Sequence, residues 1–266
     1  MPEKKKIKVP VMADLAATQQ LPEILFWVGC AGSFDDRYLR VTQDIVRILD
    51  YIGISWAVLG PEESCSGDPA KRAGNEFLFQ FQALQNISIL NAYGIRKILT
   101  ACPHCFNTIK NEYPELGGNY EVLHHSQFIQ QLIDEGKLRL SNNETFKGKK
   151  ITFHDSCYLG RANEVYEAPR QVIEALDADL VEMKRCKQNG LCCGAGGAQM
   201  FKEPEKGNQD INIARTEEAV NTGAEIIAAG CPFCMTMLTD GIKRVSPEKN
   251  IPVMDIAELV ARKLDL

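Results

Sequence analysis

The ten cysteines are the residues of this sequence best suited to metal binding and redox chemistry. Two of them are adjacent in the stretch GLCCGAGG, residues 190–197. Thiolates bind zinc and iron–sulfur clusters, and paired thiols also form disulfides or redox switches. The basic N-terminal stretch lacks an apolar run of signal-peptide length, so we expect a reducing compartment. There, metal ligands and redox groups are more common than structural disulfides.

The spacing of the cysteines occurs twice. A shift of 127 residues places Cys30 on Cys157 and Cys65 on Cys192, and a shift of 129 residues places Cys102 and Cys105 on Cys231 and Cys234. The flanks repeat as well, since ILTACPHC corresponds to IIAAGCPFC and SCSGD to LCCGA. These matches indicate an internal duplication. Cys186 has no counterpart and lies outside the repeat.

Each copy alternates short apolar runs with stretches of helical spacing. EILFWVGC and AEIIAAGC are strand-sized runs, whereas YLRVTQDIVRILDYIG has apolar residues at helical intervals and closes on Gly53. Strands separated by helices form parallel sheets with right-handed crossovers. We therefore predict an α/β fold of two tandem pseudo-symmetric domains with mainly parallel sheets.

The predicted domains span residues 22–140 and 150–266, with a polar linker, SNNETFKGK, at 141–149. Residues 1–21, which include Lys4–Lys6, are expected to form a mobile basic arm. The stretch YEVLHHSQFIQQLI has a strand-like pattern. Its two histidines, His124 and His125, lie outside the cysteine motifs and receive no predicted role.

Cysteines follow the predicted strands in both copies, so the thiols of each copy should meet at the carboxyl ends of one sheet. In the second copy five thiols converge: Cys157, Cys192, Cys193, Cys231 and Cys234. Tetrahedral zinc and an ordinary four-iron cluster each take only four thiolates, so five is one too many for either. Three glycines after the doublet would let the backbone approach a bulky cofactor and donate N–H groups to sulfur: Gly194, Gly196 and Gly197.

The first copy reads CSG where the second reads CCG, so Ser66 takes the place of the second doublet cysteine. A hydroxyl is a poorer ligand for a soft metal than a thiolate. Four thiols remain: Cys30, Cys65, Cys102 and Cys105. Four suit a cubane [4Fe-4S] cluster, zinc or no metal, and the sequence leaves these three open.

The pattern C-x34-CCG-x36-CPFC, with the flanking stretches TFHDSCYLGRANEVYEAPR and AGCPFCMTMLTDG, resembles the cysteine-rich CCG domain of heterodisulfide reductases and related iron–sulfur oxidoreductases. Within that group, the sequence is most similar to the CCG part of electron-transfer flavoprotein:menaquinone oxidoreductases. This resemblance implies a noncubane [4Fe-4S] cluster held by all five cysteines of the second copy, Cys192 and Cys193 included.

The resemblance also implies electron transfer between a flavoprotein or dehydrogenase and a quinone or ferredoxin-type partner. Reduction of a disulfide at the noncubane cluster is one alternative, and a zinc-stabilised interaction module is another. The chain lacks a C-x2-C-x2-C-x3-C-P run, so a ferredoxin-type or membrane-bound iron–sulfur subunit is the expected partner. CPHC and CPFC are also typical of redox dithiols, but a thioredoxin-like protein needs only one such pair.

Composition bears on the remaining expectations. The net charge of −5 argues against a nucleic-acid partner. The longest apolar runs are strand-sized, so we expect no direct membrane span. A cytoplasmic protein, bound through a partner at the inner face of the membrane, fits both observations. His154, three residues before Cys157, is predicted either to be a satisfied core histidine or to donate a hydrogen bond near the cluster.

Overall fold

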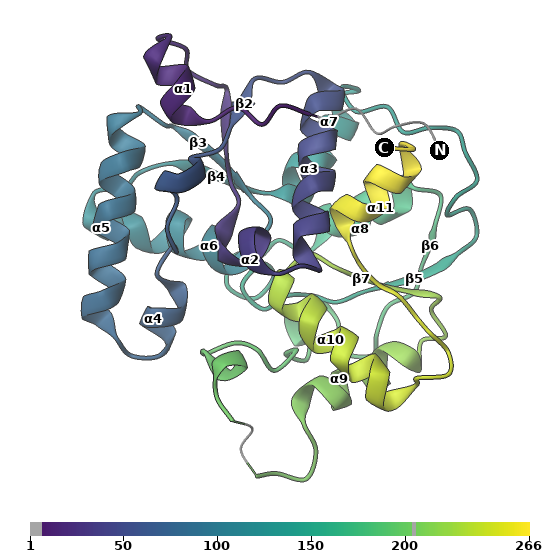
Figure 1. Cartoon of the computed structure of the whole chain (residues 1–266). Helices are drawn as coiled ribbons and strands as arrows, with labels where there is room; N and C mark the ends of the chain where they lie inside the picture. Colours follow the sequence, from purple (N-terminus) through teal and green to yellow (C-terminus); the bar gives the residue numbers. More distant parts are fainter. Residues whose placement is uncertain (1–6, 204–205) are drawn as a thin grey trace.

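The computed structural model of the chain describes residues 7–203 and 206–266. Within these ranges, two four-stranded parallel sheets are surrounded by helices (Figure 1). The first half contains β1 Ile24–Trp27, β2 Trp56–Ala57, β3 Lys97–Thr100 and β4 Glu121–His124. The second half contains β5 Lys150–Phe153, β6 Asp179–Leu180, β7 Ile226–Ala229 and β8 Val253–Asp255.

The two sheets have the same strand order, β2-β1-β3-β4 and β6-β5-β7-β8. Every pair of neighbouring strands is parallel. The structure therefore confirms the predicted α/β fold of two tandem pseudo-symmetric units. The helices of the first half are α1 Met12–Ala17, α2 Gly29–Phe34, α3 Tyr38–Ile52, α4 Asp68–Arg72, α5 Glu76–Ala92, α6 Pro103–Asn107 and α7 His125–Asp134. Those of the second are α8 Glu167–Ala175, α9 Ile211–Val220, α10 Pro232–Val245 and α11 Ile256–Lys263.

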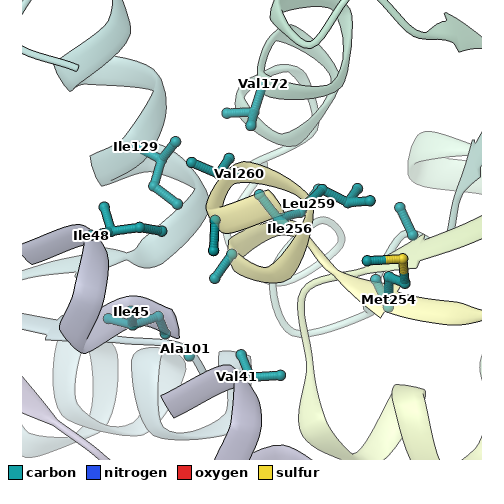
Figure 2. Packing of buried hydrophobic residues seen from close by; sticks show 14 of the residues in the cluster. Val41, Ile45, Ile48, Ala101, Ile129, Val172, Met254, Ile256, Leu259 and Val260 are labelled. Atoms are coloured by element: carbon teal, nitrogen blue, oxygen red, sulfur yellow. The ribbon is translucent and has the colours of Figure 1, made fainter. Parts of the chain in front are cut away.

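The two halves share one hydrophobic core. Helices α3 and α7 of the first half contact α11 of the second, and α7 also contacts α8. Figure 2 shows Ile45, Ile48 and Ile129 of the first half on the side of α11 toward which Val260 of the second half points, and all four belong to one buried cluster. Each such side chain contributes about 1.5–3 kcal/mol when it is fully buried. Because this core crosses the junction, the domain limits 22–140 and 150–266 stay a prediction.

The first sheet has a second core on its other face. Side chains alternate along a strand, so Ile24 and Phe26 of β1 join the shared core while Leu25 and Trp27 point the other way. There they pack with the inner face of α5, which lies at the left edge of the view in Figure 1. Cys102 and Cys105 belong to this second core as well, so two thiols of the first half share a cluster with Trp27.

The described residues 7–21, which the sequence predicts to be part of a mobile arm, make contacts with the first half of the protein. Met12 N donates a hydrogen bond to Val58 O at 2.9 Å, and Val58 N donates one to Pro10 O at 3.0 Å. Helix α1 then begins at Met12, whose side chain is buried. The segment is fixed because it pairs with the end of β2 and covers apolar surface there. Lys4–Lys6 lie outside the described residues.

The strand predicted around His124 and His125 is correct only up to His124. Helix α7 starts at His125, and a capping box encloses its first turn. His124 Nδ1 accepts from Ser126 N at 3.4 Å, and the Gln127 side chain accepts from His124 N at 3.2 Å. Satisfying these free N–H groups outweighs the strand-like pattern. No helix in the described part of the chain is long and apolar enough to cross a membrane.

Candidate functional site

The four cysteines of the first half line one small cavity, together with Ser66, His104 and Phe233. We call Cys30, Cys65, Cys102 and Cys105 the first cysteine group. Two of them follow strands, as predicted: Cys30 lies on α2 just after β1, and Cys102 precedes α6 just after β3. Cys30 is exposed, whereas Cys102 and Cys105 are buried. A hydrogen bond from Cys65 lowers the pKa of Cys30 to about 6.

Ser66 lies inside this first group. It is buried, and its Oγ is 3.5 Å from Cys105 Sγ. The adjacent Gly67 N donates to Cys65 Sγ at 3.5 Å, with Gly67 at a φ of +93° that favours glycine. The loop therefore keeps the second doublet position pointed at the other thiols, although the residue there is a serine.

The five cysteines of the second half come together at the carboxyl ends of β5 and β7. We call Cys157, Cys192, Cys193, Cys231 and Cys234 the second cysteine group. Cys193 and Cys234 have their Sγ atoms 3.3 Å apart. Hydrogen bonds from Cys157 and from Cys193 lower the pKa of Cys192 far below that of an ordinary thiol. The doublet thus bridges Cys157 on one side and Cys234 on the other.

The glycines after the doublet differ in what they do. Gly194 N donates to Cys192 Sγ at 3.3 Å, and Gly194 has a φ of +94°. Gly196 N also donates to Cys192. A Cβ atom on Gly196 would lie 4.0 Å from Cys157 Sγ, whereas one on Gly197 would meet nothing within 4 Å. Gly194 and Gly196 therefore supply backbone donors to sulfur, and Gly197, with a φ of +66°, shapes the turn.

Asp155 and Arg170 hold the loops that carry Cys157 and the doublet. The two side chains form a buried bidentate pair at 2.8 and 2.9 Å. Asp155 also accepts from Lys187 N at 2.6 Å. Arg161 donates to Gly190 O at 2.6 Å, just before the doublet. These contacts tie the 186–190 loop to the loop after β5, so the positions of the thiols are set by charge-assisted hydrogen bonds.

A histidine of the first half reaches the second cysteine group. His104 Nδ1 lies 2.8 Å from Asp68 Oδ2, and the ring also hydrogen-bonds Cys231. Burial alone would lower the pKa of His104, but these two partners raise it to about 10. For Cys231 burial alone would raise the pKa, but hydrogen bonds with Cys234 and then with His104 lower it to about 5.

His104 marks the main difference between the two copies. Its counterpart in CPFC is Phe233, and the two rings meet edge to face with centroids 5.0 Å apart. The counterpart of Asp68 is Ala195. Neither His104 nor Asp68 was predicted from the sequence. The differences between CPHC and CPFC, and between CSGD and CCGA, are the signal that could have found them.

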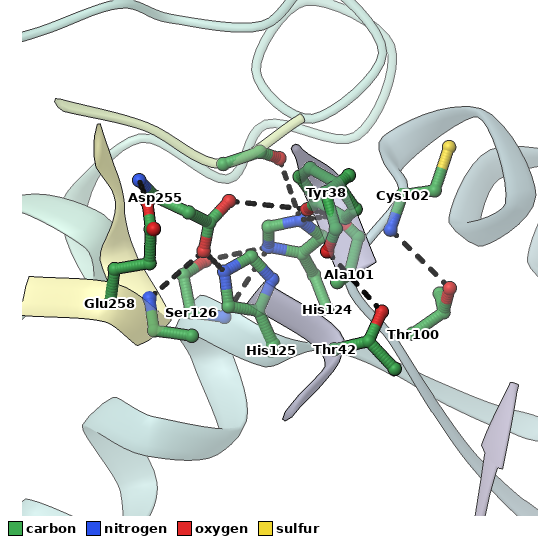
Figure 3. Close-up of polar contacts among 12 residues, drawn as sticks. Tyr38, Thr42, Thr100, Ala101, Cys102, His124, His125, Ser126, Asp255 and Glu258 are labelled. Carbon is green, nitrogen blue, oxygen red and sulfur yellow. Dashed lines mark hydrogen bonds and ion pairs between the residues drawn. The ribbon is translucent and has the colours of Figure 1, made fainter. Parts of the chain in front are cut away.

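The two histidines without a predicted role join the halves (Figure 3). His124 Nε2 lies 3.3 Å from Ala101 O and 3.0 Å from Gly230 O, the carbonyls just before Cys102 and Cys231. His125 Nε2 lies 2.8 Å from Asp255 Oδ1. Burial, and next the neighbouring His125, lower the pKa of His124 well below its ordinary value. A neutral ring with its proton on Nε2 thus links the strand ends that carry both cysteine groups.

His154 lies against the second cysteine group. A ring nitrogen of His154 and the Sγ atoms of Cys193 and Cys234 all lie within 4.8 Å of one another. His154 Nδ1 accepts from Arg215 Nε at 3.0 Å, while its buried Nε2 has no hydrogen-bond partner among the described residues. Burial, together with the charge of Arg215, lowers the pKa of His154 to about 3. Of the two predicted alternatives, the structure shows a buried histidine with only one of its two ring nitrogens hydrogen-bonded by described residues. Its partner Arg215 was not predicted from the sequence.

The donor sets fit metal centres of different size. Five converging thiols with backbone N–H donors and an unpartnered ring N–H match a multi-iron cluster with sulfide acceptors better than one tetrahedral ion. Four thiols around the small cavity of the first half match a cubane [4Fe-4S] cluster or zinc. Cys186 takes no part in either group.

Comparison with known proteins agrees with the repeat. The family model of the cysteine-rich domain CCG matches residues 24–110 and again residues 151–239. The EtfAB:quinone oxidoreductase of Syntrophomonas wolfei is 44% identical over 249 residues, which are 91% of this chain and 34% of that protein. The probable iron-sulfur-binding oxidoreductase FadF of Bacillus subtilis is 44% identical over 260 residues, 97% of this chain and 36% of that protein.

A third relative is named for a different activity. It is a subunit of the dihydromethanophenazine:CoB–CoM heterodisulfide reductase of Methanosarcina barkeri, 36% identical over 255 residues, 92% of this chain and 59% of that protein. The chain thus spans about a third of the length of the first two relatives and more than half of the third.

Proposed function

Because the chain belongs to the cysteine-rich CCG domain family and carries that domain twice, we propose that it is the iron–sulfur electron-transfer subunit of an oxidoreductase. The observation that carries this proposal is the meeting of five thiols in the second half, with Cys193 and Cys234 3.3 Å apart. A single zinc ion takes four ligands, so it would leave one buried thiol without a role.

The second cysteine group would hold a noncubane [4Fe-4S] cluster, and the first a cubane [4Fe-4S] cluster or zinc. When bound, such clusters accept and donate single electrons. The protein's own part is to hold the thiolates, to donate backbone hydrogen bonds from Gly194 and Gly196, and to exclude water. Cys193, Cys231 and Cys234 are each at most 3% exposed, which meets the last requirement.

The arrangement of the thiols suits an electron relay that is exposed to solvent at the first cysteine group. Cys30 is the exposed thiol of the first group, and an outside carrier would exchange electrons there. His104 then connects the first half to Cys231 of the second group. Electrons would pass in this way between a flavoprotein or dehydrogenase and a quinone or ferredoxin-type partner.

The relatives support this setting by their names and by their length. One is named an EtfAB:quinone oxidoreductase and another an iron-sulfur-binding oxidoreductase, and both are almost three times as long as the matched segment. A ferredoxin-type or membrane-bound iron–sulfur subunit would supply the functions of the remaining length. The chain would then work in the cytoplasm, peripherally at the inner face of the membrane.

Disulfide reduction at the second group is the second candidate. It is favoured by the 36% identity to a heterodisulfide reductase subunit. Cys157 and Cys192 are half-buried rather than enclosed, so a substrate sulfur could approach that side. Turnover of a disulfide with a reduced viologen as electron donor would select this candidate over simple electron transfer.

The test of the main proposal is the metal content of protein purified without oxygen. Iron and acid-labile sulfide should be present at about four each per chain for one cluster and about eight for two. A brown colour that dithionite bleaches, and an electron paramagnetic resonance signal from the reduced protein, should accompany them. Protein that contains zinc and no iron in both halves would overturn the proposal and favour an interaction module.

A further inference from the structure

His154 is a buried polar side chain whose second nitrogen the fold leaves unpartnered. It follows β5 and is 1% exposed. Nε2 makes no hydrogen bond with any described residue. A buried donor without an acceptor has lost its hydrogen bonds to water without replacement, so an acceptor that is not part of the polypeptide is expected at that place.

Arg215 determines which nitrogen of His154 carries the proton. Its guanidinium is completely buried and donates to three groups: His154 Nδ1 at 3.0 Å, Arg185 O at 2.7 Å and the Glu218 carboxylate at 3.0 Å. A guanidinium has donors and no acceptor. Nδ1 must therefore be the acceptor, and the proton of the neutral ring must sit on Nε2.

That tautomer excludes a direct bond from His154 to a metal. A protonated Nε2 has no lone pair to give to iron or zinc, and Nδ1 is already occupied by Arg215. The Nε2–H group needs an acceptor, and a nitrogen of this ring lies within 4.8 Å of the sulfurs of Cys193 and Cys234. His154 is thus in a position and a tautomer that allow it to donate a hydrogen bond to sulfur.

We propose that His154 donates an Nε2–H hydrogen bond to a sulfur of the second metal centre, and that Arg215 is the positioning residue that holds His154 in this tautomer. The acceptor is a ligand thiolate of Cys193 or Cys234, or an inorganic sulfide between them. This inference rests on the proposed iron–sulfur function. A hydrogen bond to sulfur stabilises the more negative, reduced state, so it raises the reduction potential of the centre.

The duplicated first half repeats the feature with a different residue. Trp27 stands 127 positions before His154 and, like it, three residues before the first cysteine of its copy. Its Nε1–H is buried and has no partner in the described part of the chain, and its ring packs in the same core as Cys102 and Cys105. An indole N–H can only donate. Both halves therefore place an unpartnered N–H donor at the same point of the repeat.

The experiment compares variants at the two positions in anaerobically purified protein, with each centre followed by redox titration and electron paramagnetic resonance. His154→Leu removes the donor and should lower the midpoint potential of the second centre. His154→Gln keeps an amide N–H and should restore a potential closer to that of the wild type. Trp27→Phe is the matched control, because it keeps an aromatic ring and should affect only the first centre.

A spectroscopic measurement on the wild type keeps the test independent of how the variants fold. In cluster-free protein, ¹⁵N-labelled His154 should show a protonated Nε2 and an unprotonated Nδ1. The opposite tautomer, or a second-centre potential that is the same in His154→Leu and the wild type, would overturn the inference. Absence of iron and sulfide would instead count against the proposed function, and the tautomer could still be read.

Discussion

Replacing His124 with glutamine should make the protein less sensitive to acid. Burial holds the pKa of His124 well below 6.5, the ordinary value. In the unfolded chain the same histidine takes up a proton as the pH falls below 6.5, while the native ring stays neutral. The unfolded state then binds more protons than the native state, so the free energy of unfolding falls with decreasing pH.

The size of this effect follows from the two protonation equilibria. At pH 5.5, one unit below the unfolded pKa, protonation stabilises the unfolded state by about 1.4 kcal/mol, and at pH 7.5 by less than about 0.1 kcal/mol. A glutamine amide does not titrate, and its two N–H groups can donate to Ala101 O and Gly230 O, the two carbonyls near His124 Nε2. It loses the acceptor for Ser126 N, which lowers stability equally at both pH values.

The assay is thermal unfolding of wild type and His124→Gln at pH 7.5 and 5.5, under the same anaerobic conditions. The wild type should lose more stability on acidification than the variant does, by about 1.4 kcal/mol or about 3–6 °C in Tm. The variant loses the acceptor for Ser126 N at both pH values, so the measurement at pH 7.5 is the control for that loss. An equal loss for both proteins between the two pH values would refute the neutral, bridging histidine.

Three further substitutions test the thiol groups and the linker. Cys193→Ser should lower the iron content and change the electron paramagnetic resonance spectrum of the second centre, and an unaltered spectrum would contradict a five-thiolate site. Cys186→Ser is the control: this cysteine lies outside both groups, so the iron content and the spectrum should stay unchanged. Ser66→Cys places a thiol where Oγ now lies 3.5 Å from Cys105 Sγ, so it should change the spectrum of the first centre. If the wild type already contained two noncubane centres, Ser66 would not be the residue that distinguishes the two copies. Lys263→Met removes the contacts that the buried Lys263 Nζ makes with Asn143 O at 2.8 Å and Asp177 Oδ2 at 2.9 Å. It should cost about 1–3 kcal/mol of unfolding free energy, whereas the exposed Lys137→Met should cost close to nothing, and equal stability of the two variants would contradict the role of Lys263.

Local patterns in the sequence were sufficient to predict the two parallel sheets and the grouping of the thiols. A short apolar run indicates a strand, and the helical spacing of apolar residues such as Val41, Ile45 and Ile48 indicates a helix. The carboxyl ends of parallel strands meet at one edge. The repeat therefore predicted that Cys30 and Cys102 lie together, and likewise Cys157 and Cys231. The same local patterns gave no indication that residues 7–21 contact the first half, because a contact at the edge of a sheet, such as Met12 N with Val58 O, leaves no periodic pattern in the sequence.

The contacts between the halves were decided only by the tertiary structure. His104 of the first half meets Cys231 of the second, 127 residues later, and His124 meets Gly230, 106 residues later. Within the second half, His154 and Arg215 meet although they are 61 residues apart. His104 and His124 took their partners when the shared core of α3, α7, α8 and α11 brought the two sheets together. Burial lowers the pKa of both histidines, but hydrogen bonds with Asp68 and Cys231 raise the pKa of His104, whereas the charge of Arg215 lowers the pKa of His154 further. The sequence alone therefore determined which thiols gather in each half, because their spacing repeats with the strands. The environment of those thiols depends on which side chains meet across the junction, and only packing in three dimensions selects them.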